Sequence, residues 1–128
     1  MAASKNQRIA GWIVSGLVAA FLALGSAPGK FRDFPGKAEM FSHLGWSVET
    51  IKPVGVVEIL VAVLYLVPQT SFIGVILMTG YLGGATATHV RVGDPFFLPP
   101  LLGVVAWVGY ALRNPDIIKS ALGVRTAS

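Results

Sequence analysis

Four apolar runs, separated by polar stretches, constrain the fold of this chain more than any other feature. The one Asp, Glu, Lys or Arg side chain inside these runs is Glu58, and the runs cover about residues 9–26, 53–67, 72–89 and 96–112. A helix needs about 17–25 apolar residues to cross the hydrocarbon core of a bilayer, so three runs reach this length and the second lies just below it. The runs therefore predict four membrane-spanning helices.

The composition also favours a location in the membrane. Hydrophobic residues make up 54% of the 128 residues and charged residues only 12%, against about 25% charged residues in ordinary soluble domains. A soluble chain of this size would have to cover its surface with charge. We therefore predict one membrane domain over residues 1–128, with the lipid bilayer as its solvent and several spans.

Several classes of site and partner are excluded or disfavoured. The chain has no cysteine, which excludes disulfides, thiolate catalysis and cysteine-ligated zinc, and no metal site is expected. The net charge is +4, but the basic residues stand singly in loops and tails, without a basic face with interleaved aromatic residues. We interpret them as contacts to lipid headgroups and expect no nucleic-acid partner.

The first run has an alternative interpretation as a secretory signal peptide. Lys5 and Arg8 resemble the basic start of such a peptide, and Ala23-Leu24-Gly25 resembles its small-residue cleavage site. We favour a membrane span, because the apolar run extends to Ser26 and so just reaches the length that spanning requires.

The connections predict how the spans are joined. Pro68-Gln69-Thr70-Ser71 is long enough only for a tight turn, so the second and third spans should be antiparallel neighbours. Asp94-Pro95 is typical of a helix start and should open the fourth span, and Asn114-Pro115-Asp116 should open a short helix over about 115–122.

A short amphipathic segment is expected between the first two spans. Over about 37–45, Met40, Phe41 and Leu44 share one helical face, with His43 on or beside the polar face, where a histidine is usually solvated. The predicted fold is therefore all-α: an antiparallel up-down transmembrane four-helix bundle with an interfacial segment between its first two helices. The positive-inside rule does not orient it, because five basic residues fall on each side. The termini side has Lys5, Arg8, Arg113, Lys119 and Arg125, and the other side has Lys30, Arg32, Lys37, Lys52 and Arg91.

Glu58 is the main candidate for a functional residue. On a helix it shares a stripe of small and polar residues with Gly55, Ala62 and Tyr65, so its side chain should point into the protein. An unpaired carboxylate near mid-membrane costs several kcal/mol, and ionisable groups in this position are functional candidates by default. The alternative is a structural hydrogen bond between helices.

The third span combines a small-residue face with polar groups at its end. Gly80, Gly83 and Gly84, together with Gly55 of the second span, are expected to let helices pack closely, within the bundle rather than between copies of the chain. His89 and Arg91 lie at the end of this span. They are candidates for the site, although basic residues at helix ends commonly extend to lipid phosphates.

These residues together resemble a known family. The pattern Pro53-x-Gly55-x-x-Glu58, then Leu66-x-Pro68, then Gly80-x-x-Gly83-Gly84-Ala85-x-x-x-His89-x-Arg91-x-Gly93-Asp94-Pro95, with Trp107 in the last span, is similar to that of the DoxX-like family of small four-helix bacterial membrane proteins. The resemblance implies a location in the bacterial plasma membrane and an association with quinone-linked redox systems. It carries no catalytic motif over to this chain.

Three functions remain open. The first is binding of a lipophilic molecule, with a quinone as the candidate cofactor, by a small subunit beside a membrane redox partner. The second is an isomerase or hydrolase with Glu58 and His89 as acid and base on an apolar substrate. The third is a structural partner without a ligand, which could form a homo-oligomer. The candidate ligand-binding residues are Glu58, Tyr65, Tyr81, His89, Arg91, Trp107 and Tyr110.

Overall fold

The computed structural model describes residues 3–124, and this part of the chain is all-α with no strand. Its α-helices are α1 (Lys5–Ala20), α2 (Lys37–His43), α3 (Val48–Leu66), α4 (Ser71–Arg91), α5 (Leu98–Arg113) and α6 (Asp116–Ala121). The predicted all-α class is confirmed. Arg125, which entered the comparison of basic residues, lies outside the described residues.

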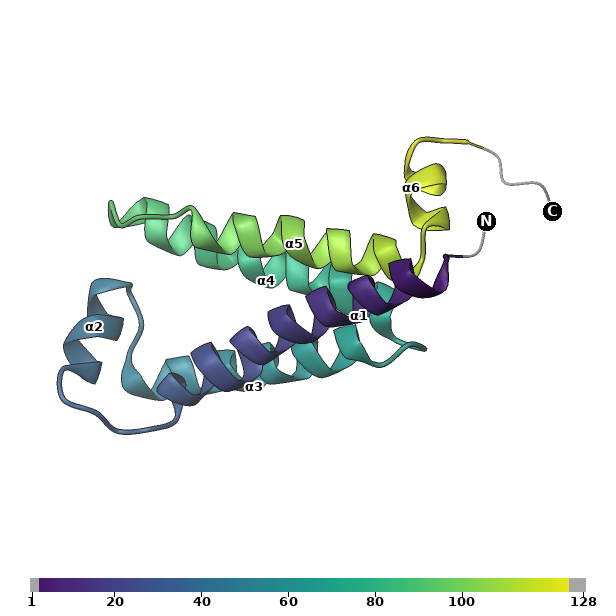
Figure 1. Cartoon of the computed structure of the whole chain (residues 1–128). Coiled ribbons are helices and arrows are strands. Elements are labelled where there is room, and N and C mark those ends of the chain that lie inside the picture. Colours follow the sequence, from purple (N-terminus) through teal and green to yellow (C-terminus); the bar gives the residue numbers. More distant parts are fainter. Residues whose placement is uncertain (1–2, 125–128) are drawn as a thin grey trace.

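The four long helices lie side by side (Figure 1). α1 packs against α3 and α5, and α4 packs against the same two helices. Successive long helices run in opposite directions, so the start of α1 and the short α6 share one end, and α2 lies at the other (Figure 1). The core between them is apolar and includes Val18, Leu22, Val61, Val75 and Met78.

The first helix is longer than its apolar run predicts. α1 continues through a π-helical segment, Phe21–Ser26, into a 3₁₀ turn, Ala27–Lys30. Pro28 stands in the first positions of that turn, where a missing backbone N–H leaves no hydrogen bond unmade. The helical chain therefore carries Lys30 to the start of α3, which the 3₁₀ turn contacts.

Two predicted helix starts are wrong, for different local reasons. α3 begins at Val48 and not near Pro53, because Ser47 and Thr50 form a reciprocal capping box one turn earlier. α5 begins at Leu98 and not directly after Asp94, whose carboxylate instead faces two histidines.

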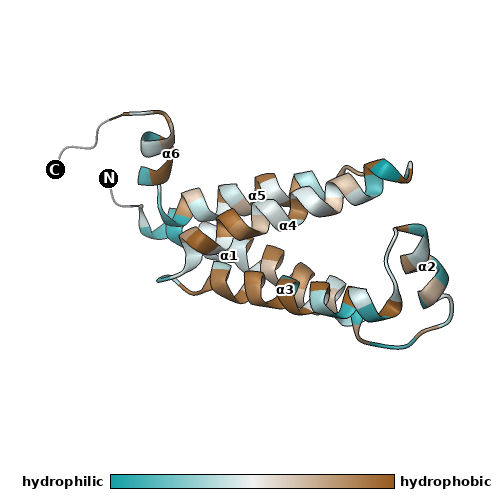
Figure 2. Cartoon of the chain, turned by 180° about the vertical axis from the view of Figure 1, so that it is seen from behind, coloured by the Kyte–Doolittle hydropathy of each residue, from teal (hydrophilic) through white to brown (hydrophobic). Residues whose placement is uncertain are grey.

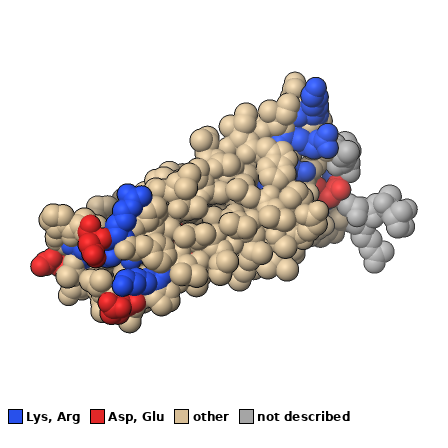
Figure 3. Space-filling view, turned by 90° about the horizontal axis from the view of Figure 1, so that it is seen from below, with Lys and Arg blue, Asp and Glu red and all other residues tan. Residues whose placement is uncertain are grey.

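The outer surface of the long helices is suited to lipid. Large apolar side chains are exposed on all four of them, Leu24 being 75% exposed, with Leu60, Ile73 and Leu101 above one half. Apolar residues extend along the helices (Figure 2), and charged residues gather at the two ends and leave the middle uncharged on the face shown in Figure 3. By length and composition, Lys5–Lys30 and Ser71–Arg91 could each cross a membrane.

Of the glycines expected to allow close packing, Gly55 is closely packed and those of α4 are not. A Cβ atom at Gly80, Gly83 or Gly84 would meet nothing within 4 Å, so the expected close packing of these glycines inside the bundle is not observed. Gly74 instead abuts the backbone of Tyr65, where α4 turns back from α3, and Gly109 faces Ser15 and Tyr65, where α5 meets α1. The small-residue spacing in α4 therefore marks an open face.

Candidate functional site: a buried ion pair at Glu58

Glu58 forms an ion pair inside the helix bundle. Its side chain is 1% exposed, and its Oε2 lies 2.7 Å from Nζ of Lys30, whose side chain is 11% exposed. Glu58 comes from the middle of α3, and Lys30 from the last residue of the 3₁₀ turn that extends α1. A buried carboxylate of this kind is stable only when it is paired, and Lys30 supplies the opposite charge.

The helical extension of α1 positions Lys30. Lys30 Nζ also donates to Ser26 Oγ at 3.1 Å, one turn earlier in the same extension. Gly55, one turn before Glu58, leaves room for Lys30 and for the ring of Phe31, which a Cβ atom there would approach to 2.8 Å. Gly55 thus lies beside the ion pair and allows the turn to approach α3.

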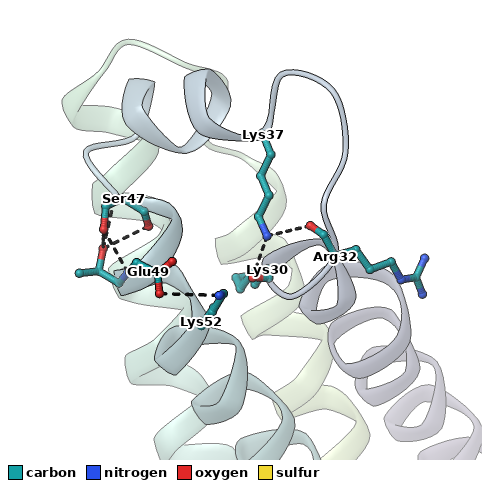
Figure 4. A network of polar contacts seen from close by, with 7 residues as sticks. Lys30, Arg32, Lys37, Ser47, Glu49 and Lys52 are labelled. Atoms are coloured by element: carbon teal, nitrogen blue, oxygen red, sulfur yellow. Dashed lines mark hydrogen bonds and ion pairs between the residues drawn. The ribbon is translucent and has the colours of Figure 1, made fainter.

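A second lysine fixes the chain that follows Lys30. Lys37 is 4% exposed, and its Nζ donates to the backbone oxygens of Lys30 at 3.2 Å and Arg32 at 2.7 Å. Figure 4 shows this ammonium directed into the turn between the two carbonyl groups. Lys37 therefore acts as a structural cap that holds Lys30 in place.

The pair leaves hydrogen-bonding capacity unused. Glu58 Oε1 is buried without a hydrogen-bond partner in the described chain. Lys30 uses two of its three ammonium hydrogens, on Glu58 and Ser26. Tyr81 of α4 is close enough for its hydroxyl to interact electrostatically with Glu58. The site can therefore offer one acceptor, one charged donor and one hydroxyl.

Most of the aromatic residues predicted to bind a ligand lie away from Glu58. Tyr65 is two turns beyond Glu58 on α3, about 10 Å along the axis, and its hydroxyl donates to the Ala106 oxygen at 2.7 Å. Tyr110 packs edge-on against Trp107 at 6.1 Å, and Trp107 Nε1 donates to Thr79 Oγ1 at 2.8 Å. Of the predicted ligand-binding aromatic residues, the structure places Tyr81 beside Glu58.

His89 and Arg91 lie in a third region, at the end of the bundle next to α2. His43 Nε2 lies 2.8 Å from Asp94 Oδ1, and His89 Nδ1 lies 3.7 Å from Asp94 Oδ2. Arg91 donates to the Leu44 oxygen at 3.0 Å. The hydrogen bond from His43 lowers the pKa of Asp94 below its ordinary value. These contacts tie α2 to the end of α4 and place His89 beside Asp94, with His89 Nδ1 buried and without a hydrogen bond in the described chain.

A groove on the outer surface is separate from the ion pair. It lies between α4 and α5, has a volume of about 520 Å³ and is lined mainly by apolar groups, including Leu82, Gly83, Gly103 and Trp107. Neither Glu58 nor Tyr81 lines it. The structure therefore separates an apolar groove from the buried polar pair.

Sequence reasoning did not identify Lys30, Ser26 and Lys37 as parts of the site. Lys30 was assigned to a loop, yet it is the first charged residue after the first apolar run. A buried carboxylate that stays charged needs a partner, so the first basic residue that follows a span was the available signal. Lys37 could not have been identified in this way, because its partners are backbone oxygens.

Comparison with known proteins completes the description. Residues 13–111 match the model of the DoxX-like family, and this range contains Lys30, Glu58 and Tyr81. No curated protein and no solved structure shows significant similarity to the chain. The match covers more than half of the 128 residues, and the resemblance inferred from the sequence is confirmed. The chain belongs to the DoxX-like family and is a membrane protein.

Proposed function

We propose that this protein spans the bacterial plasma membrane several times, with α1, α3, α4 and α5 as an antiparallel transmembrane bundle. The exposed apolar side chains on these helices and the charges at their two ends support this arrangement. The charge of Glu58, which would oppose insertion of α3, is balanced by Lys30. α2 then lies at the membrane surface, tied to α4 through Asp94.

The proposed function is to bind a lipophilic molecule with a polar head at the Lys30–Glu58 pair. The observation that carries this proposal is the buried Glu58 Oε1, which forms no hydrogen bond in the described chain although the Tyr81 hydroxyl lies near Glu58. An unsatisfied buried acceptor costs about 1–3 kcal/mol, and more when it is charged. A hydroxyl or N–H group on a ligand would remove this penalty.

A quinone and its reduced quinol are the ligands that the chemistry of this site favours. A quinol hydroxyl could donate to Glu58 Oε1, and a quinone carbonyl could accept from the remaining ammonium hydrogen of Lys30. The Tyr81 hydroxyl could donate to a quinone carbonyl or accept from a quinol hydroxyl. Electron transfer would come from the quinone and a redox partner in the membrane, and this chain would hold the head group.

The test is mass spectrometry of small molecules that copurify with the protein in mild detergent. A quinone or another hydroxylated or carbonyl-bearing lipophile should be enriched with the wild type and at least about tenfold reduced with Glu58→Gln, because the loss of a charged hydrogen bond is worth about 1.5–3 kcal/mol. Glu49→Gln, which changes an acid 82% exposed at its side chain, is the matched control and should retain the molecule.

Two results would count against binding at this pair. One is equal recovery of the molecule from the wild type and Glu58→Gln, and the other is recovery of bulk lipid alone from both. Lys30→Met/Glu58→Gln provides a second test in which no buried charge is left unpaired. It should also lose the molecule if the pair binds it.

A structural role in a complex is the second candidate, favoured by one observation. Gly80, Gly83 and Gly84 form an open face on α4, and small residues of this spacing let another helix approach closely in a membrane. A second copy of the chain or a helix of a redox partner could occupy that face. No comparable observation favours an enzyme that uses Glu58 and His89 together, since Glu58 pairs with Lys30 and His89 lies beside Asp94.

A further inference from the structure

Arg113 is a buried cation without an anionic partner. The residue is 8% exposed at the end of α5, and it forms none of the ion pairs among residues 3–124. Its guanidinium carries five N–H groups. Within residues 3–124, Nη2 donates to the Tyr65 backbone oxygen at 3.1 Å, and Nε is buried without a hydrogen bond.

Aromatic rings surround this guanidinium. Its carbon lies 4.5 Å from the ring centre of Trp12, 4.9 Å from that of Tyr65 and 5.7 Å from that of Tyr110. Cation–π contacts stabilise a cation by about 0.5–2 kcal/mol each, but they leave N–H groups unsatisfied. Gly11 allows α1 to close over the site, since a Cβ atom there would meet Arg113 Cγ at 2.8 Å.

The site lies at the end of the bundle where α1 begins and α6 lies (Figure 1). Trp12 is partly exposed there, as expected of an aromatic residue at headgroup level. Ile9, Ile13 and Leu17 expose an apolar strip along α1 from the same end. Lys5 and Arg8 in the first turns of α1 and Lys119 in α6 add positive charge to this end, where Asp116 also lies. An anion with an apolar tail would match both features.

We propose that Arg113 binds the phosphate of an anionic phospholipid, whose acyl chain lies along the apolar strip of α1. The planar guanidinium presents paired N–H donors that fit phosphate oxygens. Anionic headgroups are attracted to basic residues at the membrane surface by about 1 kcal/mol for each Lys or Arg. This site is at the opposite end of α3 from Lys30 and does not depend on the proposed ligand at Glu58.

Native mass spectrometry of the delipidated protein tests this site, with phosphatidylglycerol, phosphatidylcholine and inorganic phosphate as the three probes. The wild type should bind one phosphatidylglycerol in preference to phosphatidylcholine. Arg113→Gln should weaken that binding about tenfold or more, because a charge-assisted bidentate contact is removed. Arg8→Gln removes an exposed charge at the same end and should weaken the binding by no more than about fivefold, the contribution of one basic residue near the membrane surface.

The separate outcomes distinguish the source of the phosphate. Binding of inorganic phosphate that Arg113→Gln abolishes, without a preference for phosphatidylglycerol, would support an anion site for free phosphate and overturn the lipid as its ligand. If the wild type bound all three probes equally, that result alone would overturn the proposed site. Retention of phosphatidylglycerol by Arg113→Gln, or equal losses in Arg113→Gln and Arg8→Gln, would also overturn it.

Discussion

Removing either charge of the Lys30–Glu58 pair alone is expected to lower the free energy of unfolding by about 3–5 kcal/mol, because the remaining buried charge loses its partner. The relevant variants are Lys30→Met and Glu58→Gln, which keep the approximate shape of each side chain. Both partners are shielded from solvent and only 2.7 Å apart. The pair is therefore much less screened than a surface salt bridge, for which about 0–1 kcal/mol is usual.

The double variant separates pairing from packing. Lys30→Met/Glu58→Gln leaves no buried charge, so its destabilisation should be well below the sum of the two single effects, by at least about 2 kcal/mol. Unfolding in mixed detergent micelles with increasing dodecyl sulfate measures all four proteins. Lys52→Met, which removes an exposed lysine 3.7 Å from Glu49, is the control and should remain close to the wild type.

Additive effects would contradict this account of the pair. They would mean that Lys30 and Glu58 stabilise the bundle independently, and that the contact contributes nothing of its own. A loss at Lys52→Met as large as that at Lys30→Met would likewise show that the effect is not specific to the buried charge.

Among the glycines of α4, Gly74 is the one whose replacement by alanine is expected to disrupt packing most. A Cβ atom there would overlap backbone atoms of Leu64 and Tyr65, which cannot move aside as a flexible side chain could. Overpacking commonly costs about 1–3 kcal/mol and occasionally more. The fraction of monodisperse protein on size-exclusion chromatography and its Tm in detergent should both fall.

Gly84→Ala is the matched control on the same helix. Its Cβ atom would meet nothing within 4 Å, and alanine is about 1 kcal/mol more favourable than glycine inside a helix. The Tm should therefore stay the same or rise. Equal loss in Gly74→Ala and Gly84→Ala would show that the assigned helix crossing is wrong. A change of oligomeric mass in Gly84→Leu would instead assign this face to self-association.

The fold class was predictable because its signals are local. Apolar runs and turn residues are read directly from the sequence, and they predicted the long helices and the short segments near α2 and α6. The helix starts at Val48 and Leu98 were not predicted. α3 is capped at Ser47, before the start expected near Pro53. Asp94 contacts histidine and does not cap α5 as expected.

The site was only partly predictable because it depends on packing. Helical periodicity correctly placed Glu58 inside the protein, where it is buried. It could not reveal Lys30, which comes from a different element 28 residues earlier in the chain. The predicted ligand-binding residues were expected to form one site, but they lie in three regions: at the Lys30–Glu58 pair, near Arg113 and near Asp94. Residues on the same face of a helix can be several turns apart, so a shared face did not place them together.

Infrared difference spectroscopy of the protein in lipid vesicles tests the proposed binding at Glu58 most directly. Comparison with Glu58→Gln would assign the carboxylate band of Glu58, and Glu49→Gln would serve as the control. Adding a short-chain ubiquinol should shift the assigned band, because the quinol hydroxyl donates to the unpartnered Oε1. A Glu58 band that stays unchanged at saturating quinol, and at saturating quinone, would contradict binding at this pair.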